Sequence, residues 1–219
     1  MKNLSMNRRT FLKVTTVAGS GLLVGCSFSS PQLLSTPQAK ETELGLWVRI
    51  GTDDKVTLIL PASEMGQQSH TGQAMILAEE LEADWETIQV TTAPVNPEYG
   101  NPQQFNMQRT DGSTSISGFW EKLRQVGAGT REMLISAAAQ KWDVPAAECQ
   151  ALNGRIRHST SGRSLSYGQL AAAAAKLSPP DDPTLKTPEQ YRLIGKSVPK
   201  LHTPSKVNGS AGYGIDVRR

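Results

Sequence analysis

The chain has 219 residues, which is enough for one moderate globular domain and the start of another. A hydrophobic content of 37% and an aromatic content of 5% are typical of a soluble protein with a modest core. The net charge of +3 comes from residues 1–26, which hold four basic side chains and no acidic one, so the remainder has 19 basic and 20 acidic residues. Because that remainder has no basic stripe, the composition argues against nucleic-acid binding.

The first 26 residues resemble an export signal. Arg8 and Arg9 stand in the run Asn-Arg-Arg-Thr-Phe-Leu-Lys, and a mildly apolar stretch follows, as in twin-arginine signals. That stretch is too short and too rich in Gly, Ser and Thr to span a bilayer. Leu23-Val-Gly-Cys26 also resembles a lipobox, in which Cys26 carries a lipid anchor; ordinary cleavage nearby is the alternative. We therefore expect a periplasmic protein whose membrane attachment is limited to the signal or a lipid anchor.

The next segments predict a linker, a hairpin and a helix. Residues 27–43 are rich in Ser, Pro and Gln without periodicity, as in flexible tethers. Two β-prone runs, 46–50 and 56–60, are joined by Gly-Thr-Asp-Asp-Lys, which predicts a hairpin. Pro61 ends the second run, and the apolar positions within 74–81 keep helical spacing. A polar loop therefore connects a strand to the start of a helix.

This polar loop carries the first candidate binding residues, which are Met65, Gly66, Gln67 and Gln68, preceded by Glu64. The first turn of a helix leaves backbone N–H groups unpaired and partly positive, so such a loop suits an anion such as a phosphate. Gly66 allows a ligand to approach the backbone, and the two glutamines offer uncharged donors and acceptors. A glycine turn capped by glutamines is the alternative for the same residues.

A second polar motif precedes the longest predicted helix. A strand at 88–93 and a long loop at 94–107 lead to Thr-Asp-Gly-Ser-Thr-Ser at 110–115, and a helix is predicted from Trp120. The candidate residues of this motif are Gly112, Ser113, Thr114 and Ser115. Hydroxyl groups at a helix start either cap the helix or hold a phosphate.

Local signals also mark the later elements. Gly127 and Gly129 each cost the long helix about 1 kcal/mol relative to alanine, which close packing against a neighbour would explain. Asn153-Gly154 predicts a tight hairpin, and Ser166 to Gln169 matches a capping box before a helix. Residues 179–190, rich in proline and acid, are predicted to be a linker.

The chain contains six short motifs, one after another. They are Glu-Met-Gly-Gln (64–67), Ala-Glu-Glu-Leu-Glu-Ala-Asp-Trp (78–85), Thr-Asp-Gly-Ser-Thr-Ser (110–115), Trp-Glu-Lys-Leu-Arg (120–124), Gly-Ala-Gly-Thr-Arg-Glu-Met-Leu (127–134) and the run from Arg-Leu-Ile-Gly-Lys to Lys-Val-Asn-Gly (192–209). Together they resemble the molybdopterin-binding large subunits of the xanthine dehydrogenase and aldehyde oxidase family. The branch is the isoquinoline 1-oxidoreductase beta-subunit type, also seen in membrane-bound aldehyde dehydrogenases. The resemblance covers nearly all of the chain after about Leu44.

The resemblance implies an α+β fold with a mixed sheet and packed helices. It divides the chain into the signal (1–26), the linker (27–43), a molybdopterin-binding segment (44–178), a second linker (179–190) and the start of a small α/β hammerhead domain (191–219). Residues 211–217 would form the first strand of that domain.

The resemblance also implies a cofactor, molybdenum on molybdopterin cytosine dinucleotide, contacted by the two polar motifs. The implied partners are the remainder of the large subunit as a separate chain, an iron–sulfur subunit with a [2Fe-2S] cluster and, as a further candidate, a cytochrome c. The expected function is a share in the oxidation of aldehydes or N-heterocycles with oxygen from water, through loops that hold the cofactor. A truncated, inactive exported remnant or a binding module is the alternative.

Two positions depart from the family pattern, which usually has glycine where Gln68 and Asp111 stand. A bulkier side chain at the first position narrows the approach to the cofactor, and a carboxylate at the second repels a phosphate that it faces. The family's catalytic glutamate belongs to sequence expected after Arg219, so no catalytic residue is assigned in this chain.

The remaining ionisable residues offer no clear site. His70, His158 and His202 are the only histidines, and none has a ligand-like spacing, so His70 is expected to be solvated. Glu79 and Glu80 are adjacent and are expected on a solvated helix face. Cys149 is expected to be a small buried residue, and a cysteine metal site is excluded by the number of cysteines.

Overall fold

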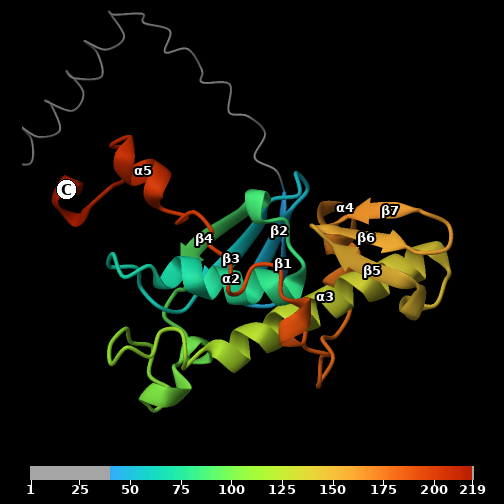
Figure 1. Ribbon diagram of the computed structural model, residues 1–219, viewed down its shortest axis with the longest axis horizontal. Coiled ribbons are helices and arrows are strands. Elements are labelled where there is room, and N and C mark those ends of the chain that lie inside the picture. The colour runs from blue at the N-terminus through green and yellow to red at the C-terminus, as the bar shows by residue number, and fades with distance from the viewer. Residues whose placement is uncertain (1–39, 219) are drawn as a thin grey trace, which may run out of the picture. The chain divides into compact units, whose positions relative to one another are not determined.

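Four strands form the first sheet of the computed structural model, which describes residues 40–218 (Figure 1). They are β1 (Glu41–Leu44), β2 (Val48–Gly51), β3 (Val56–Leu60) and β4 (Ile88–Thr92), and they lie side by side in this order. β1, β2 and β3 pair antiparallel, whereas β4 pairs parallel to β3. The predicted mixed sheet is confirmed, and β1 takes up the last residues of the segment predicted to be a linker. Arg8, Arg9 and Cys26 lie outside the described residues.

The parallel pair requires a crossover, and α2 (Ser69–Leu81) supplies it between β3 and β4. α2 packs on β3, as Figure 1 shows. The strand, loop and helix expected from the sequence are therefore confirmed, and the loop of residues 61–68 lies at the carboxyl end of β3. Eleven of the thirteen residues of α2 are buried, so its polar face is covered as well as its apolar face.

The long helix α3 (Trp120–Trp142) lies against α2. A Cβ atom on Gly127 would lie 2.6 Å from the carbonyl oxygen of Leu77 and 2.8 Å from Cβ of Glu80. Glycine is therefore required where the two helix backbones meet. Gly129 has no such contact, because a Cβ atom there would meet only Cδ of Pro180 at 3.9 Å.

The second sheet is a small antiparallel meander that leads into a helix. It comprises β5 (Cys149–Leu152), β6 (Arg155–His158) and β7 (Ser164–Ser166), followed by α4 (Tyr167–Ala174). Asn153 and Gly154 have φ values of 46° and 68°, which confirms the predicted tight turn. The backbone N–H of Ser166 donates to Oε1 of Gln169 at 3.0 Å, as expected for a capping box. Cys149 is buried, as predicted.

A single apolar core joins the first sheet, α2, α3 and α4. Its largest fully buried side chains are Tyr99, Tyr167, Phe119, Ile50, Leu58, Leu60, Leu77, Leu81, Leu123, Leu134, Ile156 and Leu170. Short 3-10 helices complete the connections, at Trp85–Thr87, Pro97–Tyr99, Pro102–Gln104, Ala146–Glu148, Pro188–Gln190 and Gly214–Asp216. Within residues 40–218, no helix is both long enough and apolar enough to cross a membrane.

The prediction of a strand at 211–217 is wrong. Residues Gly214–Asp216 form a 3-10 helix, and the short helix α5 (Thr203–Val207) precedes them. A strand needs a neighbouring strand to pair its backbone groups, and no strand of the described sheets extends beyond Ser166.

An extended segment after α4, residues 183–202, lies over the polar side of α2; we call it the strap. It includes much of the segment predicted to be a second linker. Glu79 and Glu80 hold it there, so the expectation that these two residues are solvated is wrong: their exposed fractions are 1% and 0%. Their partners lie 107 residues further along the chain in the strap and 44 residues further along in α3.

Both carboxylates have several partners. Glu79 accepts from Nζ of Lys186 at 2.6 Å and from the backbone N–H groups of Arg192 and Leu193 at 2.8 and 2.6 Å. Glu80 accepts from Nε of Arg124 on α3 at 2.8 Å and from the backbone N–H of Lys186 at 3.0 Å. These buried ion pairs fix the strap on α2 and α3.

Candidate functional site

The loop at the carboxyl end of β3 is organised by Glu64. Its Oε1 accepts from the backbone N–H groups of Gly66 and Gln68 at 2.8 and 2.9 Å, and its Oε2 accepts from that of His70 at 3.1 Å. Burial alone would raise the pKa of the Glu64 carboxyl, but these hydrogen bonds outweigh burial and lower it. The start of α2 therefore does favour an anion, but the loop's own carboxylate fills that role. At this helix start the N–H groups of Gly66, Gln68 and His70 are thus paired within the loop.

The predicted binding residues of the first loop divide into two kinds. The side chain of Gln67 closes the loop, because its Oε1 accepts from the N–H of Met65 at 2.6 Å and its Nε2 donates to the carbonyl oxygen of Ser63 at 2.7 Å. Met65 and Gln68 instead have exposed side chains. Gly66 has a φ of 103° and open space where a side chain would stand. Met65, Gly66 and Gln68 are thus available to a ligand.

The second motif forms a turn in which Gly112 and Ser113 both have positive φ values, 60° and 58°. Thr114 fixes this turn, since its hydroxyl donates to the carbonyl oxygen of Asp111 at 3.1 Å and accepts from Nδ2 of Asn101 at 2.9 Å. Asp111 pairs with Arg109, which offsets the negative charge that a phosphate would face. The side chain of Ser113 is exposed.

The second motif does not cap α3, contrary to one of the two expectations for its hydroxyl groups. α3 begins at Trp120, and its N-cap residue is Phe119, which makes no capping bond through its side chain. A turn between the motif and the helix separates the two, and in it the N–H of Gly118 donates to the carbonyl oxygen of Thr114 at 2.9 Å.

Two hydrogen bonds join the motif loops, although the loops lie more than forty residues apart in the sequence. The backbone N–H of Ser63 donates to Oγ1 of Thr110 at 2.8 Å. Nε2 of Gln73, on α2, donates to the carbonyl oxygen of Ser115 at 2.6 Å. Gln73 is completely buried, and its Oε1 has no hydrogen-bond partner. The candidate binding residues predicted from the sequence omitted Ser63, Thr110 and Gln73, although a glutamine among the buried positions of a helix is a signal of such a contact.

The residues fit a pterin-type cofactor in one respect and not in another. The orphaned Oε1 of Gln73 can accept one further hydrogen bond at the junction of the loops. The exposed side chains of Gln68 and Ser113 add donors and acceptors of the kind that a pterin or phosphate uses. The backbone N–H groups bound to Glu64, in contrast, are already satisfied, so they do not fit as a phosphate site.

Exposed apolar side chains surround the motif loops. Met65 is 70% exposed and Phe105 is 89% exposed, and Met107 and Ile116 are exposed on the same stretch of chain as the second motif. Groups of exposed, large apolar side chains mark surfaces that bind another protein or a ligand.

His70 contacts His202, and His202 lines a cavity of about 240 Å³ together with Glu64, Gly66 and Gln68. The expectation that His70 is solvated is wrong: it is 4% exposed, and burial lowers the pKa of its imidazole. Its Nδ1 lies 3.1 Å from Nε2 of His202, so two histidines without a ligand-like spacing in the sequence meet in the fold. The strap produces this contact, which the spacing in the sequence could not reveal.

His158 has a separate environment. Its Nε2 lies 2.8 Å from a carboxylate oxygen of Glu148, and its Nδ1 lies 2.7 Å from Oγ of Ser161. The contact with Ser161 lies in the turn between β6 and β7, and the contact with Glu148 ties β6 to the residue before β5. A larger cavity, of about 360 Å³, is lined by apolar residues of α3 and the chain after α4 and by none of the predicted binding residues.

Comparisons with known proteins agree with the motifs. A family model described as "Molybdopterin cofactor-binding domain" matches residues 5–217. The chain is 35% identical over 218 residues to isoquinoline 1-oxidoreductase subunit beta of Brevundimonas diminuta, and this match covers 84% of the chain and 28% of that protein. It is 30% identical over 226 residues to the membrane-bound aldehyde dehydrogenase (pyrroloquinoline-quinone) of Gluconacetobacter polyoxogenes, covering 98% of the chain and 28% of that protein. The chain thus spans little more than a quarter of the length of these relatives.

Among solved structures, the crystal structure of quinoline 2-oxidoreductase from Pseudomonas putida 86 matches with a TM-score of 0.44 and 17% sequence identity. This match covers 63% of the chain and 17% of that protein. At this level the likeness carries no argument about the site.

Proposed function

The chain belongs to the family of molybdopterin cofactor-binding domains, and we propose that it forms part of the large subunit of a molybdenum hydroxylase. In this proposal the two motif loops line one side of the site for molybdopterin cytosine dinucleotide. The bound cofactor would supply the molybdenum centre at which an aldehyde or an N-heterocycle is oxidised with oxygen from water. The residues of this chain hold and orient the cofactor.

The observation that carries the proposal is the junction between the two motif loops. The hydrogen bonds from Ser63 to Thr110 and from Gln73 to Ser115 bring both sets of candidate residues to one surface. The free Oε1 of Gln73 at that junction supports a ligand that donates a hydrogen bond. Gln68 and Ser113 are the side chains best placed to bind it, and Gln67 acts by shaping the loop.

The exposed apolar side chains around the loops support a second element of the proposal, a protein partner. Met65, Phe105, Met107 and Ile116 would be covered by the remainder of the large subunit. An iron–sulfur subunit with a [2Fe-2S] cluster would accept the electrons, and a cytochrome c is a candidate for the next step.

The proposed location is the periplasm. The paired Arg8 and Arg9 and the apolar stretch after them support export by the twin-arginine route, which carries proteins already folded around a cofactor. The Leu-Val-Gly-Cys26 sequence supports a lipid anchor as the form of membrane attachment.

The test is the molybdenum content of the protein purified from the envelope of its native host, with every co-purifying chain identified by mass spectrometry. We expect stoichiometric molybdenum in a complex with a larger chain. In the same complex, Ser113→Ala should lower the molybdenum content several-fold, whereas Ser178→Ala, at an exposed serine outside both motifs, should not. Absence of both metal and partner under cofactor-replete conditions would favour the alternative, an exported remnant or binding module.

A further inference from the structure

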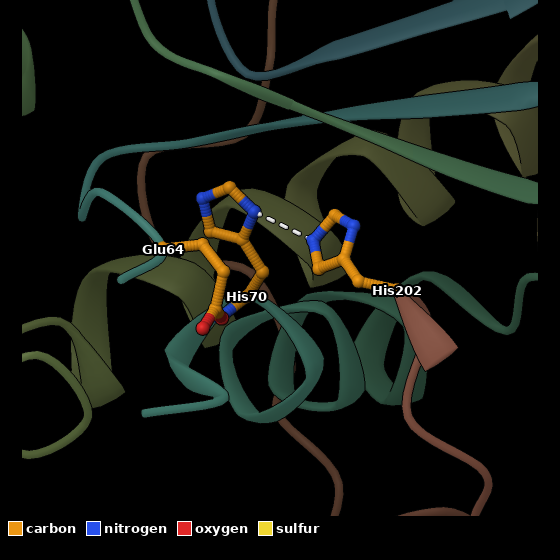
Figure 2. A group of neighbouring side chains, drawn as sticks. All are labelled: Glu64, His70 and His202. Carbon is orange, nitrogen blue, oxygen red and sulfur yellow. Dashed lines mark hydrogen bonds between the residues drawn. The ribbon is translucent and has the colours of Figure 1, made fainter. Parts of the chain in front are cut away.

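The imidazole rings of His70 and His202 meet edge to edge beside the first motif loop (Figure 2). Nδ1 of His70 and Nε2 of His202 are 3.1 Å apart. With a zinc ion about 2.1 Å from each nitrogen, the N–Zn–N angle would be roughly 95° at that separation. Moving the two nitrogens apart by about 0.3 Å gives the tetrahedral angle. Zinc has no electronic preference for another geometry, so it accepts this arrangement. The spacing therefore suits shared coordination of one metal ion.

The orientation of His70 is fixed in the way expected of a metal ligand. Its Nε2 lies 2.9 Å from the carbonyl oxygen of Ala62, and only a protonated nitrogen can bond to a carbonyl oxygen. The lone pair of the neutral ring must then be on Nδ1, which is the atom that faces His202. Histidines that bind metals commonly donate their other N–H to a backbone carbonyl in this manner.

Glu64 supplies the third ligand. One carboxylate oxygen of Glu64 and one nitrogen of each histidine lie within 4.8 Å of one another. Figure 2 shows the carboxylate turned toward the start of α2, where Oε2 accepts a single N–H bond, from His70. A carboxylate oxygen can accept more than one bond, so Oε2 keeps a free lone pair beside the N–H of His70.

We propose that Glu64, His70 and His202 bind a divalent cation of the Zn²⁺ class, beside the first motif loop. Two imidazoles and one carboxylate are a ligand set that zinc accepts, and they leave a fourth position for water. The ion would tie the first motif loop and α2 to the end of the strap. Lys200 and Lys206 line the same cavity as His202 and oppose a cation, but both side chains are exposed, so water and salt screen their charge.

The test is titration of the full chain, purified free of metal and of molybdenum cofactor, with Zn²⁺ alone. We expect one equivalent to bind, measured by calorimetry, and the melting temperature to rise as bound zinc stabilises the folded state. Co²⁺ in place of zinc should give the visible absorption bands of a four-coordinate site. Because no molybdenum cofactor is present, failure of this test leaves the proposed function untouched, and failure of the proposed function leaves this test untouched.

Matched variants locate the site. His202→Ala removes a ligand at a partly exposed position and should weaken zinc binding at least tenfold while the circular dichroism spectrum stays that of the parent. His158→Gln changes the histidine that pairs with Glu148 elsewhere and should bind zinc as the parent does. Zinc affinity equal to the parent's in His202→Ala, or less than one equivalent bound by the parent, overturns the proposal.

Discussion

Two glycines in α3, two residues apart, should respond in opposite directions to the same substitution. Replacing a glycine within a helix by alanine stabilises the helix by about 1 kcal/mol when the added methyl group has room. At Gly127 it has none, because the methyl carbon would lie 2.6 Å from the carbonyl oxygen of Leu77 and 3.1 Å from the backbone nitrogen of Leu81. These atoms belong to the backbone of α2 and cannot rotate away.

The expected size follows from these contacts. Adding a methyl group to a tightly packed site typically costs about 1–3 kcal/mol, and the helix gains about 1 kcal/mol in return. The close contacts place Gly127→Ala at the upper end of that cost, so we expect a net loss of about 1–2 kcal/mol. Gly129→Ala meets only Cδ of Pro180 at 3.9 Å and should gain about 0.4–1 kcal/mol.

Urea unfolding of the two variants, followed by circular dichroism of the full chain, measures both changes. The free energies of unfolding should differ by about 2 kcal/mol between variants that share a helix and a chemical change. In a thermal scan the same difference corresponds to roughly 4–8 °C for a chain of this size. Equal stabilisation by both substitutions would refute the close approach of α2 and α3 at Gly127.

Two further predictions concern buried polar groups. Burial alone would raise the pKa of the Glu79 carboxyl, but the bond from Lys186 and those from backbone N–H groups outweigh it and lower the pKa below its usual 4.5. Since the folded-state pKa is the lower one, this stabilisation is complete above about pH 4.5 and is lost as pH falls through the folded-state pKa. The free energy of unfolding should therefore depend less on pH below 4.5 in Glu79→Gln than in the parent. The same pH dependence in both proteins would contradict the contribution of the Glu79 carboxylate. Tyr167→Phe removes the bond from the buried hydroxyl to the carbonyl oxygen of Leu81 at 2.6 Å and should cost about 1–3 kcal/mol in urea unfolding; a cost near zero would show that water replaces it.

Features whose cause lies in neighbouring residues were predictable from the sequence. The hairpin at Asn153-Gly154 forms because two adjacent residues tolerate positive φ. The strand, loop and helix around Pro61 follow from a short apolar run, a residue that stops it and helical spacing after it. For the same reason the sequence located both motif loops, although it did not show that they touch.

Features that depend on distant residues were not predictable in this way. Glu79 and Glu80 have the local appearance of a solvated helix face, and only the arrival of Lys186 and Arg124 makes their burial favourable. Within the first loop, residue types indicated a site for an anion but could not show that Glu64 already occupies it. The start of α2 favours an anion, as its residues indicated, but their types did not identify the Glu64 carboxylate as that anion.

The polar side of α2 explains why the strap matters to the site. Three polar side chains on this side would be costly to bury alone, yet each has a partner in the strap. The partners are the N–H of Leu201 for Thr71, the side chain of Lys186 for Glu79 and the ring of His202 for His70. These contacts run along α2 from its last turns to its first, which adjoins the first motif loop. A change that detaches the strap should therefore alter the motif loop as well, since it removes the cover over His70 and opens the cavity beside Gly66 and Gln68.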